Sequence, residues 1–305
     1  MNSQNKTIVL KQPPNMFLLM LKAAAKRTYR DISASQLPNM DNKVLVLKKR
    51  RVPVDKIKLF NQLVNWQGQP DVLHPCILHN LLFPLHLRLF LDKSFPFALA
   101  GLVHIKNDIH QVRPILASED LDVSCYLTDF QVHPKGWMFS VCSQVHSDGG
   151  LLWESKSTNL FRLTQPQKIA STRPGIDNPK PNGYSENWQL RADLGRKYAR
   201  SSGDYNLIHL YPLAAKLFGF KRQIAHGMWT KARSLSALQQ LNPIFFKQQF
   251  SVEVKFIKAI YLPTTVEFGC STNNSSDSSV GFSVCSPNSN NREITQHLQG
   301  KFKVN

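Results

Sequence analysis

The chain has 305 residues, of which 42% are hydrophobic and 19% are charged, and its formal net charge is +18. This length allows two domains of average size or one large one, and the composition excludes a disordered chain. Lys and Arg are spread along the sequence, so the charge favours an anionic partner, although a basic protein without such a partner is the alternative. No zinc-finger spacing or RNA-binding motif accompanies the charge, so no nucleic-acid partner is expected. The five cysteines are widely spaced, without a CxxC pair or a Cys–His cluster, which predicts free thiols and a cytoplasmic location.

Residues 1–43 are predicted to be an N-terminal extension with one helix, from Asn15 to about Arg27. This helix contains the apolar run MFLLML, which is too short to span a membrane and has no clear cleavage site of a secretory signal. We expect the helix to pack on the main body of the protein, and contact with a membrane or a partner is the alternative.

The first half of the protein is predicted to be one domain over residues 44–163. An alternating pattern from Lys43 predicts a strand, and a helix is predicted over 54–66. The stretch FPLHLRLFLDKSFPF predicts a second helix with Pro84 in its first turn. Four segments rich in β-branched and aromatic residues follow, at 99–109, 121–132, 137–147 and 151–163. One helix followed by adjacent strands favours an antiparallel sheet with a helix against it.

Residues 164–187 are rich in Pro, Gly, Asn and Ser, which predicts a linker before a second domain over 188–305. This domain has predicted helical segments around Tyr198 and Leu213, a long helix over 227–241, and four strands at 250–260, 264–272, 279–286 and 294–304. A polar hairpin loop is expected between the two middle strands. The repeated order of a helix and four strands indicates an internal duplication and an α+β fold class.

The stretch SGDYNLIHLYP places Asp204, Asn206 and His209 close together among apolar residues. On a straight helix Asp204 and His209 would lie roughly 140° apart, so both can face one site only if the segment is irregular. Gly203 permits a special turn, and Pro212 begins the next helix, which Gly219 ends. The alternative is that the Asp and Asn cap turns and that the His is a half-buried structural residue.

The stretch IAHGMW, from Ile224 to Trp229, begins the long helix predicted at 227–241. The first N–H groups of a helix have no partner within it, and Gly227 leaves room for a substrate oxygen to approach them. Free N–H groups and the helix dipole together suit an oxyanion. The alternative is a glycine that only permits tight helix packing. Together the two stretches suit proton transfer next to a thioester carbonyl.

These two stretches resemble the signature of the MaoC-like (R)-specific enoyl hydratases and dehydratases, which is a Gly-Asp-x-Asn-Pro-x-His turn followed by an Ala/Val-His-Gly-Met helix start. The resemblance is close from Tyr198 to Trp229 and looser to Val304. It implies a double hotdog fold, in which each half is a long helix wrapped by an antiparallel sheet. The usual Pro of the motif is Leu207 here, which removes rigidity from the turn but no reacting group.

The resemblance also assigns residues. Asp204 and His209 match the catalytic pair, and Gly227 matches the glycine whose N–H faces the thioester oxygen. Asn206, His226 and Met228 are expected to be substrate-binding residues, and Asn206 is also expected to support the turn. No metal site and no cofactor are expected.

The first half resembles a hotdog domain that has lost its site and would line the acyl pocket. FPLHLRLF is expected to occupy the place of AHGMWTKA, and Asp71 and His74 lack the Gly-Asp-x-Asn frame.

The resemblance implies an enzyme, a hydro-lyase that interconverts trans-2-enoyl and (3R)-3-hydroxyacyl thioesters in fatty acid metabolism. Its substrate would be a thioester of CoA or of acyl carrier protein, and homo-oligomers of double-hotdog protomers are compatible with the family. The alternatives are a non-catalytic acyl-thioester-binding hotdog protein and a hotdog thioesterase. Retention of both Asp204 and His209 argues against the first, and the specific motif argues against the second.

Overall fold

A computed structural model describes residues 6–26, 43–99, 102–162, 183–271, 279–287 and 294–305. The elements of the first half are β1 (Lys6–Leu10), α1 (Met16–Ala25), β2 (Lys43–Arg50), α2 (Val54–Val64), α3 (Ile77–Phe90), β3 (Leu102–Gln111), β4 (Leu121–His133), β5 (Gly136–Ser147) and β6 (Gly150–Arg162). Those of the second half are β7 (Gly183–Leu190), α4 (Leu194–Ser202), α5 (Leu207–Leu210), α6 (Pro212–Leu217), α7 (Gly227–Leu241), the 3₁₀ helix η1 (Pro243–Lys247), β8 (Phe250–Phe256), β9 (Thr264–Ser271), β10 (Ser279–Pro287) and β11 (Ile294–Val304).

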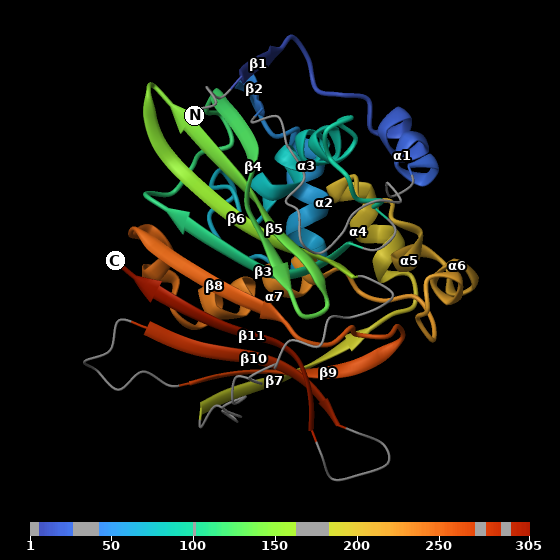
Figure 1. The fold of residues 1–305 in the computed structure, drawn as a ribbon. Helices are drawn as coiled ribbons and strands as arrows, with labels where there is room; N and C mark the ends of the chain where they lie inside the picture. Colours follow the sequence, from blue (N-terminus) through green and yellow to red (C-terminus); the bar gives the residue numbers. More distant parts are fainter. Residues whose placement is uncertain (1–5, 27–42, 100–101, 163–182, 272–278, 288–293) are drawn as a thin grey trace.

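The strands form one sheet of 11 strands in the order β1-β2-β4-β5-β6-β3-β8-β11-β10-β9-β7. Apart from the parallel pair β1 and β2, neighbouring strands are antiparallel. In the described part of the chain, the first-half strands and the second-half strands meet at β3 and β8, where Lys106 pairs with Lys255 and Gln111 with Phe250. In Figure 1 the helices lie on one side of this sheet, with the green strands of the first half above the orange and red strands of the second.

The sheet order confirms the predicted duplication. From the β3–β8 junction outward, β3, β6, β5, β4 and β2 correspond to β8, β11, β10, β9 and β7. In each half the longest helix, α3 or α7, also precedes four consecutive strands, with η1 between α7 and β8. Each half is thus a long helix against an antiparallel sheet, as a double hotdog requires.

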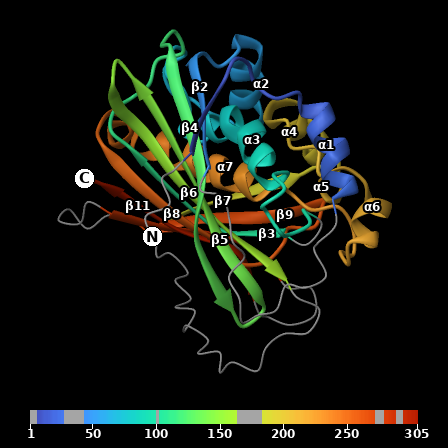
Figure 2. The ribbon, with the colours of Figure 1, turned by 45° about the horizontal axis from the view of Figure 1, so that its top comes forward.

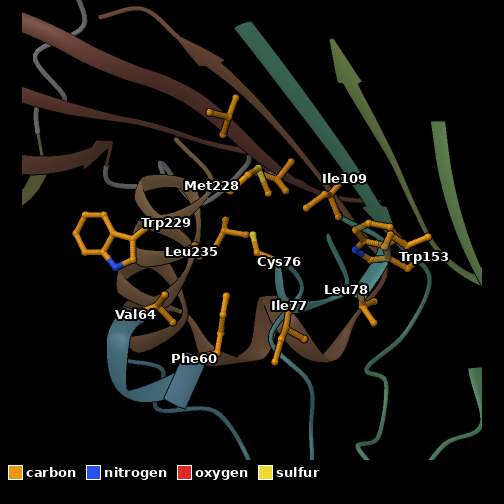
Figure 3. Packing of buried hydrophobic residues seen from close by; sticks show 14 of the residues in the cluster. Phe60, Val64, Cys76, Ile77, Leu78, Ile109, Trp153, Met228, Trp229 and Leu235 are labelled. Atoms are coloured by element: carbon orange, nitrogen blue, oxygen red, sulfur yellow. The ribbon is translucent and has the colours of Figure 1, made fainter. Parts of the chain in front are cut away.

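The two long helices bury most of their surface, because each lies between the sheet and the other helices. Eleven of the fifteen residues of α7 are buried, and so are nine of the fourteen of α3. Figure 3 shows Leu235 of α7 next to Cys76, which precedes α3, and Trp229 beside Val64 at the end of α2. The Trp229 indole also donates to the Leu63 carbonyl at 2.9 Å. The two halves therefore share one core.

The start of α3 differs from the sequence prediction. The helix begins at Ile77, so Pro84 lies inside it rather than in its first turn. A turn at His74-Pro75-Cys76 sets this start, because the Cys76 N–H donates to His74 Nδ1 at 2.9 Å. The equivalent of Gly227 is therefore Ile77, and the prediction that FPLHLRLF occupies the place of AHGMWTKA is wrong.

The N-terminal helix α1 packs on the main body through buried Leu19 and Ala23, as expected from the sequence. The Lys26 ammonium also donates to the carbonyl oxygens of Phe90 and Phe95.

Most of the predicted linker and of the predicted hairpin loop after β9 lie outside the described residues. The described end of the linker, from Gly183, is strand β7, which pairs with β9. Among the described residues, no helix combines the length and the apolar character needed to cross a membrane.

Candidate active site

The turn after α4 positions the Asp204 carboxylate. Gly203 ends the helix with φ of 78°, the left-handed conformation that glycine adopts without strain. The Asp204 N–H then donates to Ser202 Oγ at 3.1 Å, and Asp204 Oδ1 accepts the Asn206 N–H at 3.1 Å. The Asn206 side chain in turn caps α5 by accepting the Ile208 N–H at 3.4 Å. This turn replaces the regular helix that would have separated Asp204 from His209.

His209 lies on the single turn α5, and its tautomer follows from its contacts. Its Nδ1 lies 2.9 Å from the Ile224 carbonyl oxygen, which can only accept. The Nδ1 atom therefore carries the proton, and Nε2 of the neutral ring has a free lone pair. A close approach of α4 helps to hold this turn, because a Cβ at Gly195 would lie 1.9 Å from the His209 carbonyl oxygen.

His226, the residue before α7, completes a cluster with the predicted pair. Its ring stacks on the His209 ring with centroids 3.7 Å apart. Its Nε2 donates to the Asp204 carbonyl oxygen at 3.1 Å and lies 3.9 Å from Asp204 Oδ2. The ring of Tyr198 packs against His226 at 4.9 Å. The fold thus brings Asp204, His209 and His226 together from both predicted stretches.

Burial shifts the pKa values of this cluster toward one another. Removal from water raises the pKa of the Asp204 carboxyl, although 27% of that side chain is exposed, and the nearby His209 opposes the shift. Burial lowers the pKa of His209, against the opposing effect of Asp204. Burial and the neighbouring His209 hold the pKa of His226 well below its ordinary value. The difference between the pKa values of Asp204 and His209 is therefore smaller than in water, which favours proton exchange between them.

Gly227 is the first residue of α7, so its N–H belongs to the turn that has no partner within the helix. A Cβ at this position would lie 3.0 Å from the Phe256 ring, so the space beside the N–H is narrow. The chain that leads into the helix is held by two backbone bonds, from the Ile224 N–H to the Ile208 carbonyl and from the Ala225 N–H to the Ile260 carbonyl.

A cavity of about 1560 Å³ connects these residues and extends into the first half. Its lining includes Asp204, Asn206, His209, His226, Gly227 and Met228, which are all the residues that the sequence predicted for the site. The helices α1, α4, α5 and α6 lie on the same side of the molecule (Figures 1 and 2), and α1, α4 and α5 contribute residues to the cavity lining. Basic side chains at Lys221, Arg222 and Lys258 also line it.

Sequence reasoning expected the first half to line the acyl pocket but named no residue of α3 or β3 there, and it missed Tyr198 as part of the site. The Tyr198 hydroxyl donates to Asn80 Oδ1 at 3.3 Å and so connects the site to α3. His79 and His86 of α3 also line the cavity. Their spacing of seven residues, which is two helical turns, places them on one face of the helix and could have indicated a shared location. In contrast, His74 of the first half is a structural residue, because it is fully buried and its Nε2 donates to the Ala232 carbonyl at 3.1 Å.

The three side chains of the cluster also offer donors for a metal ion, since their nearest ligand atoms lie within 4.8 Å of one another. However, His209 Nδ1 and His226 Nε2 already bond to backbone carbonyls. A metal would have to use His209 Nε2, the Asp204 carboxylate and His226 Nδ1, which is buried and unpartnered among the described residues. The expectation of a metal-free site stays a prediction.

Known proteins match parts of this sequence. Residues 180–284 match the family described as "MaoC like domain". A 3-hydroxyacyl-thioester dehydratase X of Mycobacterium tuberculosis is 31% identical over 185 residues, which is 61% of this chain. The matched segment spans 65% of that relative, just under two thirds of its length.

Solved structures show the same fold over most of both chains. The crystal structure of HtdX from Mycobacterium tuberculosis has a TM-score of 0.70 at 23% identity and covers 86% of this chain and 100% of its own. A MaoC-like dehydratase from Phytophthora capsici has a TM-score of 0.69 at 17% identity and covers 90% of this chain and 98% of its own.

The repeated unit of a long helix and antiparallel strands defines a double hotdog protein. Over residues 180–284 the second half is similar to the MaoC-like domain family.

Proposed function

We propose that this protein is a hydro-lyase that interconverts (3R)-3-hydroxyacyl thioesters with trans-2-enoyl thioesters and water. The observation that carries the proposal is the placement of Asp204, His209 and the Gly227 N–H on one cavity. An acid, a base and an oxyanion donor are the groups that this reaction needs. The 3-hydroxyacyl-thioester dehydratase among the relatives supports the same reaction.

In the proposed mechanism, Gly227 N–H donates to the thioester carbonyl oxygen. Negative charge grows on this oxygen when the α-proton leaves, so the N–H and the helix dipole stabilise the transition state. An oxyanion donor of this kind contributes about 10²–10³ in rate.

Asp204 and His209 handle the proton and the water. In dehydration, the C2–H bond breaks and its proton passes to one group of the pair. The C3–O bond breaks as the other group protonates the leaving hydroxyl, so that water departs and the C2–C3 double bond forms. The smaller difference between the two pKa values lets the pair return to its starting protonation state by internal transfer. Hydration runs through the same steps in reverse.

The two halves have separate roles in this proposal. Residues 188–305 form the catalytic MaoC-like domain, and residues 44–163 form a degenerate hotdog domain that supplies acyl-pocket lining such as Phe83 and Leu87. Asn206, His226 and Met228 bind substrate or hold the groups that do.

The proposed substrate is a thioester of CoA or of acyl carrier protein. Both carriers are anionic, and Lys221, Arg222 and Lys258 around the cavity suit either one.

The dependence of kcat/KM on salt distinguishes the two carriers. A carrier protein meets a broad surface, whereas CoA meets the few residues at the mouth. Salt shortens the Debye length from about 10 Å at 0.1 M to about 3 Å at 1 M. If a carrier-protein thioester is the natural substrate, its kcat/KM should therefore fall more with added salt than the kcat/KM of a short acyl-CoA. Equal decreases would contradict the assignment of a carrier protein as the natural partner.

Hydration of crotonyl-CoA tests the reaction. The enoyl absorbance should fall without release of free CoA, and chromatography should identify (3R)-3-hydroxybutyryl-CoA as the product. Release of free CoA would instead indicate a thioesterase, and binding without any conversion would indicate a non-catalytic acyl-thioester-binding protein.

A further inference from the structure

A second group of imidazoles lines the cavity away from the proposed reacting residues. It consists of His79 and His86 on α3 and His104 on β3, which are called the histidine cluster below. The His79 ring centroid lies 5.2 Å from that of His86 and 6.1 Å from that of His104. None of the three has a role in the proposed reaction.

The histidine cluster lies one aromatic ring beyond the proposed oxyanion donor. The Phe256 ring is the neighbour that a Cβ at Gly227 would meet at 3.0 Å, and the His104 ring centroid lies 4.9 Å from the Phe256 centroid. An acyl chain whose thioester oxygen lies at the Gly227 N–H would reach the histidine cluster with its carbons beyond C3, since all these side chains line the same cavity.

The surroundings of the histidine cluster keep its imidazoles neutral. Burial, together with the nearby Lys231 ammonium, lowers the pKa of His79 to about 4. Burial and the neighbouring His79 and Lys231 lower the pKa of His104 to about 3. Burial also holds the pKa of His86 well below its ordinary value. A neutral imidazole has one donor and one acceptor nitrogen, so the histidine cluster offers both kinds of hydrogen bond.

Part of this hydrogen-bonding capacity is unused. His86 Nε2 bonds to Ser143 Oγ at 2.7 Å. In the described part of the chain, however, His79 Nδ1 and His104 Nε2 are buried without a partner. A purely hydrocarbon chain in the cavity would leave them unpaired, which is costly in a site away from water. An oxygen on the chain that reaches these nitrogens would satisfy them.

A buried ammonium behind the histidine cluster distinguishes between kinds of oxygen. Lys231 is fully buried, and its Nζ donates to the Asn107 carbonyl at 2.9 Å, to Asn107 Oδ1 at 2.6 Å and to the Val252 carbonyl at 3.5 Å. Its three N–H bonds are therefore in use, and it is not free to bind a ligand carboxylate. The histidine cluster itself is neutral, so it suits a neutral oxygen better than an anion.

We propose that the histidine cluster binds a hydroxyl or keto oxygen on the acyl chain, beyond the carbons that react. This inference rests on one part of the proposed function, which is that the ligand is an acyl thioester. It makes the preferred substrate an oxygenated acyl thioester rather than a plain fatty acyl thioester.

Equilibrium binding to the wild-type protein tests the proposal without turnover. The probes are saturated octanoyl-CoA, its derivatives with one hydroxyl at a carbon from C5 to C8 or one keto oxygen at a carbon from C5 to C7, and suberyl-CoA, which carries a terminal carboxylate. Calorimetry should show at least one oxygenated derivative binding about tenfold or more tightly than octanoyl-CoA. Equal or tighter binding of octanoyl-CoA, or tightest binding of suberyl-CoA, would overturn the proposal.

Variants localise the effect. His79→Phe and His104→Phe keep an aromatic ring but remove the nitrogens, so they should abolish the preference for the oxygenated derivative over octanoyl-CoA. His133→Phe on the β4 hairpin is the matched control and should keep the preference, since His133 does not line the cavity. A preference that survives in both cluster variants would contradict the assignment.

Binding is measured apart from catalysis, so the two proposals can fail separately. If the protein hydrates crotonyl-CoA but shows no preference for an oxygenated chain, only this inference is wrong. If the protein shows the preference but does not hydrate crotonyl-CoA, only the proposed function is wrong.

Discussion

At the scale of single residues, the Asp204 turn and the His209 ring are held by backbone groups as much as by each other. The Asp204 carboxylate accepts an N–H from its own turn, and the His209 ring donates to the chain before α7. Substitutions that keep these shapes should therefore remove chemistry and preserve the fold.

Asp204→Asn and His209→Gln should each lower the turnover of crotonyl-CoA by about two orders of magnitude or more, because each removes a positioned acid or base. Circular dichroism should show unchanged secondary structure. Asp148→Asn and His133→Gln are matched controls away from the cavity lining and should retain full activity. Near wild-type turnover in both folded site variants would show that the assignment of the pair is wrong.

Gly227→Ala should also reduce kcat, by about tenfold or more. The added Cβ would lie 3.0 Å from the Phe256 ring, in the space beside the N–H that we assign to the thioester oxygen. The double variant Gly227→Ala/Phe256→Leu relieves the packing conflict but keeps the methyl group beside the N–H. Thermal unfolding should therefore show recovered stability, whereas steady-state kinetics should show no recovery of kcat. Full recovery of kcat would indicate that the glycine serves packing alone.

At the scale of elements, the junction between β3 and β8 joins the two halves. It pairs six residues on each strand, and the helices α2, α3 and α7 pack across the same boundary. The site also crosses it, because Tyr198 bonds to Asn80 and the cavity has lining from both halves. The second half therefore has the proposed reacting groups but depends on the first for its pocket and for one strand edge.

A truncated chain that begins at Gly183 should accordingly be poorly soluble or form an aberrant dimer. It exposes the free edge of β8 and the apolar face of α7, and such surfaces promote association. Size-exclusion chromatography with light scattering measures the outcome. A monodisperse and fully active monomer would contradict the dependence of one half on the other.

At the scale of the whole molecule, several imidazoles are buried and neutral. Burial lowers the pKa of His74 to about 3, and the pKa values of His79 and His104 are lowered to about 4 and about 3. The ordinary value is 6.5, so below pH 6.5 the unfolded chain binds protons that the folded chain does not. The free energy of unfolding should therefore be highest above pH 6.5 and fall as the pH drops toward 4.

Each of these imidazoles should contribute about 1.4 kcal/mol per pH unit to this loss. Denaturant unfolding at pH 7.5, 6.5, 5.5 and 5.0 measures the slope. His79→Gln removes one titrating group and should flatten the slope by about one such contribution. A free energy of unfolding that is constant from pH 7.5 to 5.0 would contradict the buried neutral state of these rings.

The sequence by itself determined most of the elements and the proposed reacting residues, because their signals are local, but it did not predict strands β1 and β7. Strand alternation and the apolar face of 227–241 predicted the bounds of α7 and of the consecutive strands to within a few residues. The turn around Asp204 was predictable because Gly203, Asn206 and Pro212 each act on their own backbone neighbours. Pro84 was misplaced because α3 begins at Ile77, after a turn in which the Cys76 N–H donates to His74 Nδ1.

Only the tertiary structure decided how these parts combine. The joining of β3 to β8 brings residues about 140 apart in the chain into register, and no local pattern marks such a pair. The same long-range packing places His226 on His209, Tyr198 on Asn80, and the histidine cluster beyond Phe256. The pKa shifts also arise there, because burial depends on what the folded chain places around a side chain rather than on its neighbours in sequence.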